Sequence, residues 1–276
     1  MAIGAFALAA ASTYAATSSI FWVAQKRLVF GRAARIRTLK AGPFEGQHDV
    51  HALWLKVAPG VSLEGWVARP KIGRTGNVLV YFGGRNEHVG WAAGMASHIG
   101  PWSVYAFNYR GFGGSSGHPS ESSAKSDALQ VLDEIRRLEG GGEHARAPVV
   151  MGRSLGTAMA ISVATKRDIA RLVLLSPFDS VRSLIRQRTP LNSMCWLLNQ
   201  NFDCIGDAGR VNAETMILLA NTDRRVPHKN STRLAAALCN LKQLNMVPGA
   251  NHKTLPRLPE TQARIAAWLN EGKLVD

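Results

Sequence analysis

Cysteine is scarce in this chain, and the spacing of the cysteines argues against both a zinc-binding protein and a disulfide-stabilised protein. Three cysteines occur among 276 residues, and Cys195, Cys204 and Cys239 form no CxxC pair. Such a pattern predicts neither a zinc site nor a disulfide framework. No Gly-Lys-Ser/Thr phosphate loop is present either, so the sequence implies no metal and no cofactor.

Acidic residues are also few, and the chain is strongly basic. Lys and Arg number 33 against 19 Asp and Glu, for a net charge of +14. Such a charge raises the possibility of a nucleic-acid partner. However, no basic stretch is interleaved with aromatic residues, and the densest cluster, residues 25–40, directly follows an apolar segment. We therefore expect a membrane flank and no nucleic-acid partner.

The first residues lack charge altogether. Residues 2–24 contain no charged side chain, and this length is enough for a helix to cross a bilayer. No Lys or Arg precedes the stretch, which argues against a cleaved signal peptide and export. We expect a single-pass anchor over 1–25, a basic arm over 26–48 and, by the positive-inside tendency, a cytoplasmic domain. A secreted protein and a soluble apolar arm are the alternatives.

The rest of the chain alternates strand and helix patterns. Residues 51–70 alternate polar and apolar side chains around Pro59-Gly60, which predicts an antiparallel hairpin. Later strands are continuous apolar runs, typical of a parallel sheet covered on both faces. These runs are residues 77–82, 102–107, 147–151, 170–175 and 215–220. Helices are predicted over 89–98, 121–138, 155–166, 230–239 and 257–269. The sequence thus predicts one α/β domain over 49–276, with helices on both faces and a small helical cap at about 177–213.

One serine stands where a strand pattern gives way to a helix pattern. In "VVMGRSLGTAMA", Ser154 lies between Gly152 and Gly156. A turn this tight needs small neighbours, and it projects the serine oxygen beyond the sheet beside the positive end of a helix. We therefore predict that Ser154 is a nucleophile.

A serine nucleophile needs a base and an acid that orients the base, in the order Ser, Asp, His. Asp223 follows the apolar run "MILLA", and His252 follows "QLNMV". Both are therefore expected at the carboxyl edge of the sheet, beside Ser154. The alternatives are rated lower: His228 stands at an expected helix start, and Asp203 and Asp207 follow no buried strand.

An oxyanion hole is expected from two backbone N–H groups. Leu155, directly after the serine, supplies one, and the loop "FGGRNEH" supplies the other. Arg85 is the first choice for this second donor and Gly84 the alternative. The alternative is that Gly83 and Gly84 do no more than form a tight turn.

Several motifs together resemble the α/β-hydrolase superfamily. These are "GRSLG", "NYRGFGGSSG", "NTDRRVP" and "GANH". More narrowly they are similar to membrane-anchored hydrolases of the serine-aminopeptidase and monoglyceride-lipase-like group, in which an apolar N-terminal helix precedes a Gln-x-x-Leu arm, matched by "QKRLVFG". The resemblance runs from about Phe21 to the last helix and implies Ser154, Asp223 and His252 as a catalytic triad. Relatives often carry His-Gly or Gly-Gly-Asn-Ala at the oxyanion loop, where this chain has Gly-Gly-Arg-Asn.

Two further segments are expected near the site. Residues 108–120 form a Gly/Ser loop, which we interpret as structural and without a catalytic residue. Residues 176–215 are the longest connection and are expected to cover the strand ends. Their apolar residues either line an acyl pocket or pack on the domain; these include Leu184, Trp196, Leu197 and Leu198.

The sequence therefore predicts a serine hydrolase that cleaves an ester, thioester or amide of a small-molecule or acylated substrate through an acyl-enzyme. An anchor would suit a lipid ester or an acylated protein. The alternative is a catalytically idle binding or scaffold protein of the same fold at the membrane.

Overall fold

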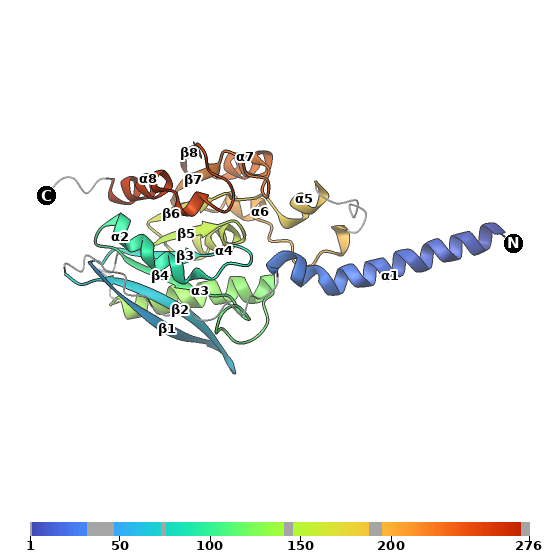
Figure 1. The fold of residues 1–276 in the computed structure, drawn as a ribbon, viewed down its shortest axis with the longest axis horizontal. Helices are drawn as coiled ribbons and strands as arrows, with labels where there is room; N and C mark the ends of the chain where they lie inside the picture. Colours follow the sequence, from blue (N-terminus) through green and yellow to red (C-terminus); the bar gives the residue numbers. More distant parts are fainter. Residues whose placement is uncertain (1, 32–46, 73–75, 141–145, 188–194, 272–276) are drawn as a thin grey trace.

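An eight-stranded, mostly parallel sheet forms the centre of the protein (Figure 1). The computed structural model describes residues 2–31, 47–72, 76–140, 146–187 and 195–271, with side chains from residue 12 onward. Most of the predicted basic arm, part of the predicted cap and the last residues of the chain lie outside these ranges. The strand order is β1-β2-β4-β3-β5-β6-β7-β8. The strands are β1 (His48–Ala58), β2 (Val61–Pro70), β3 (Val78–Phe82), β4 (Ser103–Phe107), β5 (Val149–Arg153), β6 (Arg171–Leu175), β7 (Glu214–Ala220) and β8 (Leu241–Val247).

The direction of the strands agrees with the sequence patterns. β1 and β2 form the antiparallel hairpin that the alternating residues predict, and β2 pairs antiparallel with β4. From β4 to β8 every neighbouring pair is parallel. Their carboxyl ends therefore meet at one edge, where the loops of a parallel α/β sheet form binding sites.

Helices cover both faces of the sheet. The helices are α1 (Ala2–Phe30), α2 (Ala96–Ile99), α3 (Glu121–Leu138), α4 (Leu155–Ala164), α5 (Val181–Arg186), α6 (Ile205–Ala208), α7 (His228–Ala237) and α8 (Pro259–Asn270), with 3-10 turns η1 (Val89–Met95) and η3 (Leu255–Arg257). The hydrophobic cluster on one face includes α3, α4, α6 and α7, and that on the other includes η1, α2 and α8. The helix expected over 89–98 is thus a 3-10 turn followed by one short helix.

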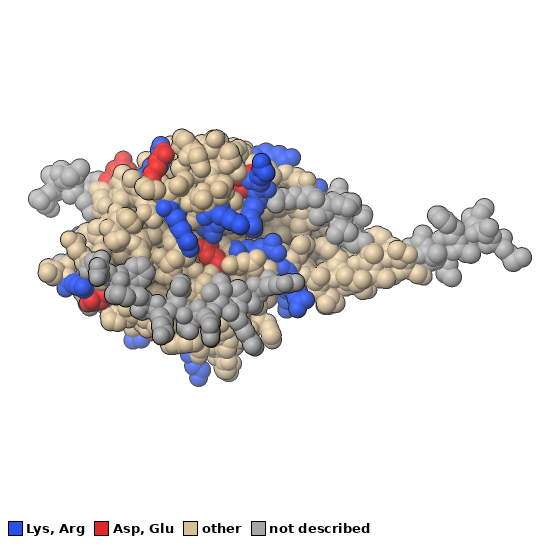
Figure 2. Space-filling model, in the orientation of Figure 1, with Lys and Arg blue, Asp and Glu red and all other residues tan. Residues whose placement is uncertain are grey.

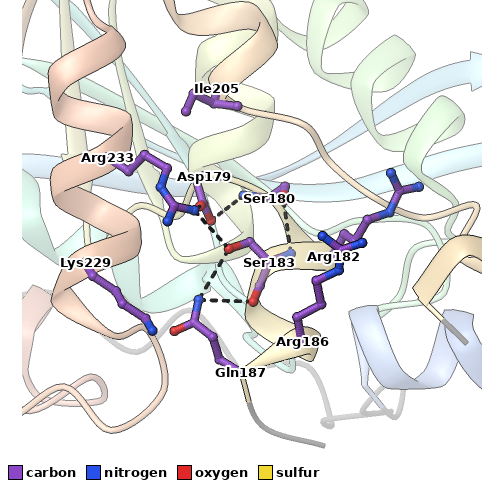
Figure 3. Close-up of a pocket in the computed structure, with 9 residues that line it drawn as sticks. All are labelled: Asp179, Ser180, Arg182, Ser183, Arg186, Gln187, Ile205, Lys229 and Arg233. Atoms are coloured by element: carbon purple, nitrogen blue, oxygen red, sulfur yellow. Dashed lines mark hydrogen bonds and ion pairs between the residues drawn. The ribbon is translucent and has the colours of Figure 1, made fainter. Parts of the chain in front are cut away.

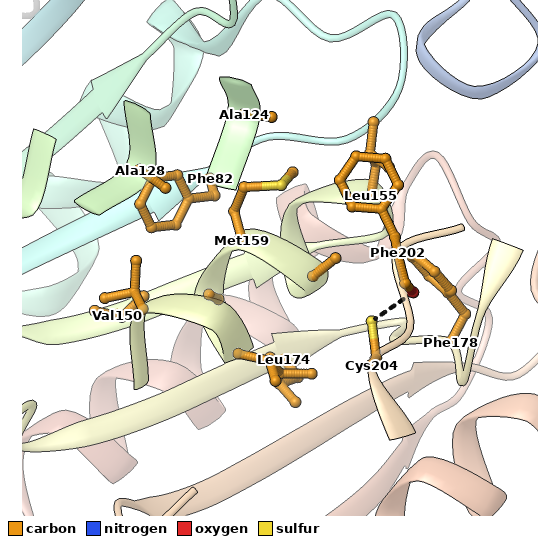
Figure 4. Close-up of a cluster of buried hydrophobic side chains, with 14 of the residues drawn as sticks. Phe82, Ala124, Ala128, Val150, Leu155, Met159, Leu174, Phe178, Phe202 and Cys204 are labelled. Atoms are coloured by element: carbon orange, nitrogen blue, oxygen red, sulfur yellow. Dashed lines mark hydrogen bonds between the residues drawn. The ribbon is translucent and has the colours of Figure 1, made fainter. Parts of the chain in front are cut away.

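The two hydrophobic clusters explain why the central strands are apolar at successive positions. In β5, Val150 packs in one cluster, whereas Val149 and Met151 pack in the other. Figure 4 shows Val150 near Phe82 and Met159 in the first cluster. A strand buried on both faces has no position for a solvated polar side chain.

Helix α1 extends away from the domain, and its C-terminal part packs on it (Figure 1). Phe21, Val29 and Phe30 are buried in the first cluster. The Phe30 ring meets the Phe202 ring edge to face, with centroids 5.7 Å apart, and the Gln25 carboxamide accepts the N–H of Asn199 at 2.8 Å.

A transmembrane helix is expected over residues 1–25. A helix forms there, but within the described ranges no helix is both long and apolar enough to span a bilayer.

Helix α4 packs unusually close to the sheet at its first turn. A Cβ on Gly156 would overlap the carbonyl oxygen of Phe82, at the end of β3, and a Cβ on Gly152 would lie 2.5 Å from the carbonyl oxygen of Gly156. All of these neighbours are backbone atoms, which cannot move aside as a side chain can. The two glycines that flank Ser154 are therefore required by packing.

We expect Gly156→Ala to lower the free energy of unfolding by about 1–3 kcal/mol, because the extra methyl group forces α4 away from β3. Denaturation in urea measures the change. Gly209→Ala is the matched control, since Gly209 has φ −65° and its Cβ would meet no atom closer than 4.0 Å. Equal stability of the Gly156 variant and the wild type would contradict the close contact.

Candidate active site

Ser154 occupies a strained backbone position between β5 and α4. Its φ is 50° and its ψ −117°, a conformation that costs a non-glycine residue of order 1–3 kcal/mol. The Ser154 N–H donates to the Leu175 carbonyl at 2.9 Å, which continues the β5–β6 pairing up to the turn. The strained turn is thus held by the sheet on one side and by α4 on the other.

The structure brings the three predicted side chains into contact. Asp223 lies in the loop after β7, and His252 in the loop after β8. Nε2 of His252 is 3.1 Å from Oγ of Ser154, and Nδ1 is 2.8 Å from Oδ2 of Asp223. With its proton on Nδ1, donated to Asp223, the neutral imidazole offers Nε2 as an acceptor to the Ser154 hydroxyl. This arrangement can transfer a proton away from the serine.

Asp223 is fixed as an anion beneath the histidine. Its side chain is 2% exposed, and its Oδ1 accepts the backbone N–H groups of Arg225 and Val226, each at 2.8 Å. Burial alone would raise the pKa of Asp223, but the hydrogen bond and charge of His252 and the Val226 N–H lower it to about 2. Asp223 is therefore ionised at neutral pH, with one oxygen directed at His252.

The alternative candidates lie in other contacts. His228 is the first residue of α7, and its Nε2 pairs with the carbonyl of Ala220 at 2.8 Å. Asp203 accepts the Gly206 N–H, and Asp207 pairs with Arg210. Each contact is local, and none of these residues lines the cavity that contains Ser154.

The two candidates for the second oxyanion donor differ in this structure. The Gly84 N–H already donates to Oε2 of Glu87 at 2.5 Å. The N–H groups of Leu155 and Arg85 have no acceptor among the residues that the structure describes. Leu155 begins α4, so its N–H lies at the positive end of that helix. Arg85 and Leu155 therefore remain as the available donors.

Sequence reasoning missed a buried carboxylate in the same loop. Glu87 accepts four hydrogen bonds: from Tyr81 at 2.8 Å, Trp91 at 2.8 Å, Gly84 at 2.5 Å and Arg153 at 2.6 Å. Burial, together with the charge of Glu87, raises the pKa of Tyr81 well above its ordinary value, so its hydroxyl stays a donor. Glu87 thus fixes the loop that carries Arg85.

Arg153 extends this network to the histidine loop. While one guanidinium nitrogen pairs with Glu87, the other donates to the backbone carbonyl of His252 at 2.8 Å. The side chains of Glu87 and Arg153 are only 7% and 12% exposed. The one signal for this pair in the sequence is a charged residue at the end of an otherwise apolar strand, directly before Ser154.

The Gly/Ser loop supports the site from outside the cavity. Its Tyr109 hydroxyl donates to the Gly83 carbonyl at 2.8 Å. Asn108 accepts the Val89 N–H at 3.1 Å and donates to the buried Glu64 at 3.0 Å. No residue of 108–120 lines the cavity at Ser154.

A cavity of about 1000 Å³ opens beside Ser154. Helix α5 forms one wall through Val181, Leu184 and Ile185, and the end of α1 contributes Leu28 and Val29. Of the four apolar residues expected near the site, only Leu184 lines the cavity. Trp196 is 67% exposed, whereas Leu197 and Leu198 pack on the core.

The opposite side of α5 is polar and fixed to α7. Buried Asp179 accepts hydrogen bonds from Asn230 and Arg233, each at 2.7 Å, and Ser180 caps the helix by accepting the Ser183 N–H. Asp179, Ser180, Ser183 and Arg233 line a second, smaller hollow of about 410 Å³, which Figure 3 shows. The network holds the apolar side of α5 over the cavity. No cluster of His, Cys, Asp and Glu within the described residues could hold a metal ion.

Asp223 should contribute stability that depends on pH. Its folded pKa of about 2 lies below the ordinary 3.8, so the stabilisation is complete well above pH 3.8 and is lost as pH falls toward 2. Asp223→Asn mimics the protonated acid. We expect the gap in unfolding free energy between wild type and variant to narrow from pH 6 to pH 3, as measured by urea denaturation. A gap independent of pH would contradict this assignment.

The Arg153–Glu87 pair gives a second prediction. Arg153→Met should lower the free energy of unfolding by about 3–5 kcal/mol, because it leaves Glu87 buried without its counter-charge. The double variant Glu87→Gln/Arg153→Met should recover part of this loss, because no buried charge remains. Thermal and urea denaturation of the single and double variants measure the coupling. Additive losses would show that the pair does not interact.

Known proteins resemble this chain in sequence and in fold. The family model described as serine aminopeptidase, S33, matches residues 73–203. An uncharacterised protein of Mycobacterium tuberculosis is 30% identical over 234 residues, which cover 84% of this chain and 81% of that protein. A yeast protein named as an uncharacterised membrane protein is 38% identical over 120 residues, covering 42% of this chain and 41% of its own.

Solved structures agree with the fold. Est1E from Butyrivibrio proteoclasticus, solved with bound ferulic acid, superposes with a TM-score of 0.64 at 17% identity and covers 81% of this chain and 98% of its own. Together with the strand order and the sequence matches, this likeness identifies the chain as a hydrolase by family. It belongs to the α/β-hydrolase superfamily, in the serine-aminopeptidase-like group.

Proposed function

We propose that this protein is a serine hydrolase that cleaves an acyl ester or thioester through an acyl-enzyme on Ser154. The observation that carries the proposal is the continuous contact from Ser154 Oγ to His252 Nε2 and from His252 Nδ1 to Asp223. Its place at the carboxyl edge of the sheet, beside a cavity of about 1000 Å³, gives a substrate access to the serine.

The first half of the reaction forms the acyl-enzyme. Ser154 Oγ attacks the substrate carbonyl carbon while His252 Nε2 takes its proton. Asp223 keeps the imidazole in the required tautomer and stabilises the imidazolium. The N–H groups of Leu155 and Arg85 bind the oxyanion, a type of interaction whose single donors are worth about 10²–10³ in rate. As the intermediate collapses, the leaving oxygen or sulfur takes the proton from His252.

The second half releases the acid. Water gives a proton to His252 Nε2 and its oxygen attacks the acyl carbon. The Ser154 ester bond then breaks, and Ser154 Oγ recovers the proton from His252. Arg153 has a positioning role in both halves, because it ties the His252 backbone to the loop that carries Arg85.

The proposal predicts that a fluorophosphonate probe labels Ser154 in the full-length protein. Ser154→Ala should abolish labelling, and His252→Ala should slow it by about 10³-fold or more. His228→Ala is the matched control and should label like the wild type, because His228 bonds to Ala220 and not to Ser154.

Circular dichroism of each variant shows whether it is folded. A folded wild-type protein that the probe does not label would contradict the proposal and favour an idle binding protein.

A further inference from the structure

The cavity at Ser154 is lined by two chemically different groups of side chains, which come from different elements and form what we call its apolar half and its cationic rim. One half is apolar and is formed by the start of α4, the segment before and within α5, and the end of α1. Its side chains are Leu28, Val29, Leu155, Phe178, Val181, Leu184 and Ile185. Such a surface suits an aliphatic chain, because each buried CH₂ group contributes about 0.8 kcal/mol.

The rim of the other half is positively charged. Four exposed cations line it: Arg85, Arg225, Lys253 and Arg257. No acidic side chain of the described residues forms an ion pair with any of them. Lys and Arg side chains gather on the face of the molecule drawn in Figure 2, with few Asp or Glu among them.

The acidic side chains beside the rim already have partners of their own. Glu87 is paired with Arg153 at 2.6 Å, and Asp223 with His252 at 2.8 Å. The rim cations also repel one another: burial first, and then the charge of Arg225, lowers the pKa of Arg85. A bound anion would relieve this repulsion.

At least one of these cations is held in place before any ligand binds. The Arg257 guanidinium lies 4.7 Å from the centroid of the Trp91 ring. Trp91 is itself fixed by its hydrogen bond to Glu87 at 2.8 Å. Arginine in a fixed orientation matches the oxygens of phosphate and carboxylate groups.

The positions of the cations relate them to one part of the substrate. Arg225 follows Asp223, and Lys253 and Arg257 follow His252, so three of the four come from the two loops that carry the proposed base and its acid. In the proposed reaction the leaving group takes its proton from His252, so it lies on this side. The acyl carbonyl, by contrast, faces the Leu155 and Arg85 N–H groups, next to the apolar half.

We propose that the substrate is an acyl ester or thioester whose leaving group carries phosphate or carboxylate groups, with the acyl chain in the apolar half and the anionic leaving group at the cationic rim. This inference rests on the proposed serine hydrolase. It adds a preference for an anionic leaving group, which neither the contact among Ser154, His252 and Asp223 nor the fold requires.

Two matched pairs of substrates test whether a negative charge on the leaving group raises kcat/KM. They also show whether a coenzyme A or a glycerol phosphate leaving group supplies that charge. Decanoyl-coenzyme A is compared with decanoyl-N-acetylcysteamine, a neutral thioester with the same acyl chain. Decanoyl glycerol 3-phosphate is compared with decanoyl glycerol in the same way. We expect kcat/KM to be about ten-fold or more higher for the anionic member of at least one pair, and this ratio to fall as salt rises from about 20 mM to about 0.5 M.

Variants then test whether the rim cations cause the preference for the anionic substrates. Arg225→Ala/Arg257→Ala should bring the anionic-to-neutral ratio of kcat/KM close to one. Arg224→Ala removes the same charge from a neighbouring residue that does not line the cavity, and the wild-type ratio should remain.

The outcomes separate this inference from the one it rests on. Ratios near one in both pairs, in a protein whose Ser154 still labels with fluorophosphonate, overturn the anionic leaving group and leave the hydrolase intact. A high ratio that survives the double substitution overturns the role of the rim. A folded protein that neither labels nor cleaves any of the four substrates overturns the proposed function, and this inference with it.

Discussion

The buried ion pair between Glu87 and Arg153 connects the three loops that meet at the carboxyl edge of the sheet. Glu87 belongs to the loop after β3, Arg153 ends β5, and its second nitrogen holds the loop after β8 through the His252 carbonyl. Loops have few regular hydrogen bonds of their own, so their relative positions depend on such cross-links. This one pair therefore ties together the segments that carry Arg85, Ser154 and His252.

The hydrophobic core makes the surroundings of this pair, including the turn at Ser154, rigid. Strands buried on both faces and a helix packed against the backbone of β3 leave no room for Ser154 to relax from its positive φ. Close packing of this kind resists small movements, which is why a strained turn can be kept at a functional position. The strain is local, but the energy that maintains it comes from both hydrophobic clusters.

The features predicted from sequence were those with local signals. Apolar runs predicted the strands, and glycines on both sides of a serine predicted the turn at Ser154. Chain order predicted that Asp223 and His252 would lie at the same edge, and the structure places them in contact. Their catalytic roles remain proposals. The Glu87–Arg153 pair joins residues 66 positions apart, and no local pattern encodes such a partner.

The N-terminal segment shows a second limit of sequence patterns. An uncharged stretch rich in alanine predicts a helix, and one is present, but its composition does not say what the helix packs against. The sequence favours Arg85 over Gly84 as the second donor, and the structure adds that the Gly84 N–H already donates to Glu87. For the helix, the missing information is the identity of neighbours distant in the chain. For the loop, it is the local geometry that directs the Gly84 N–H to Glu87, three residues further on.

Helix α1 also gives the cavity a feature that the catalytic loops do not supply. Leu28 and Val29 lie in its last turns and form part of the wall beside Ser154. A chain that began after Gly31 would keep the serine, the histidine and the aspartate, yet its cavity would be open along one side. The amino-terminal helix therefore closes one side of the space in which a substrate would be held.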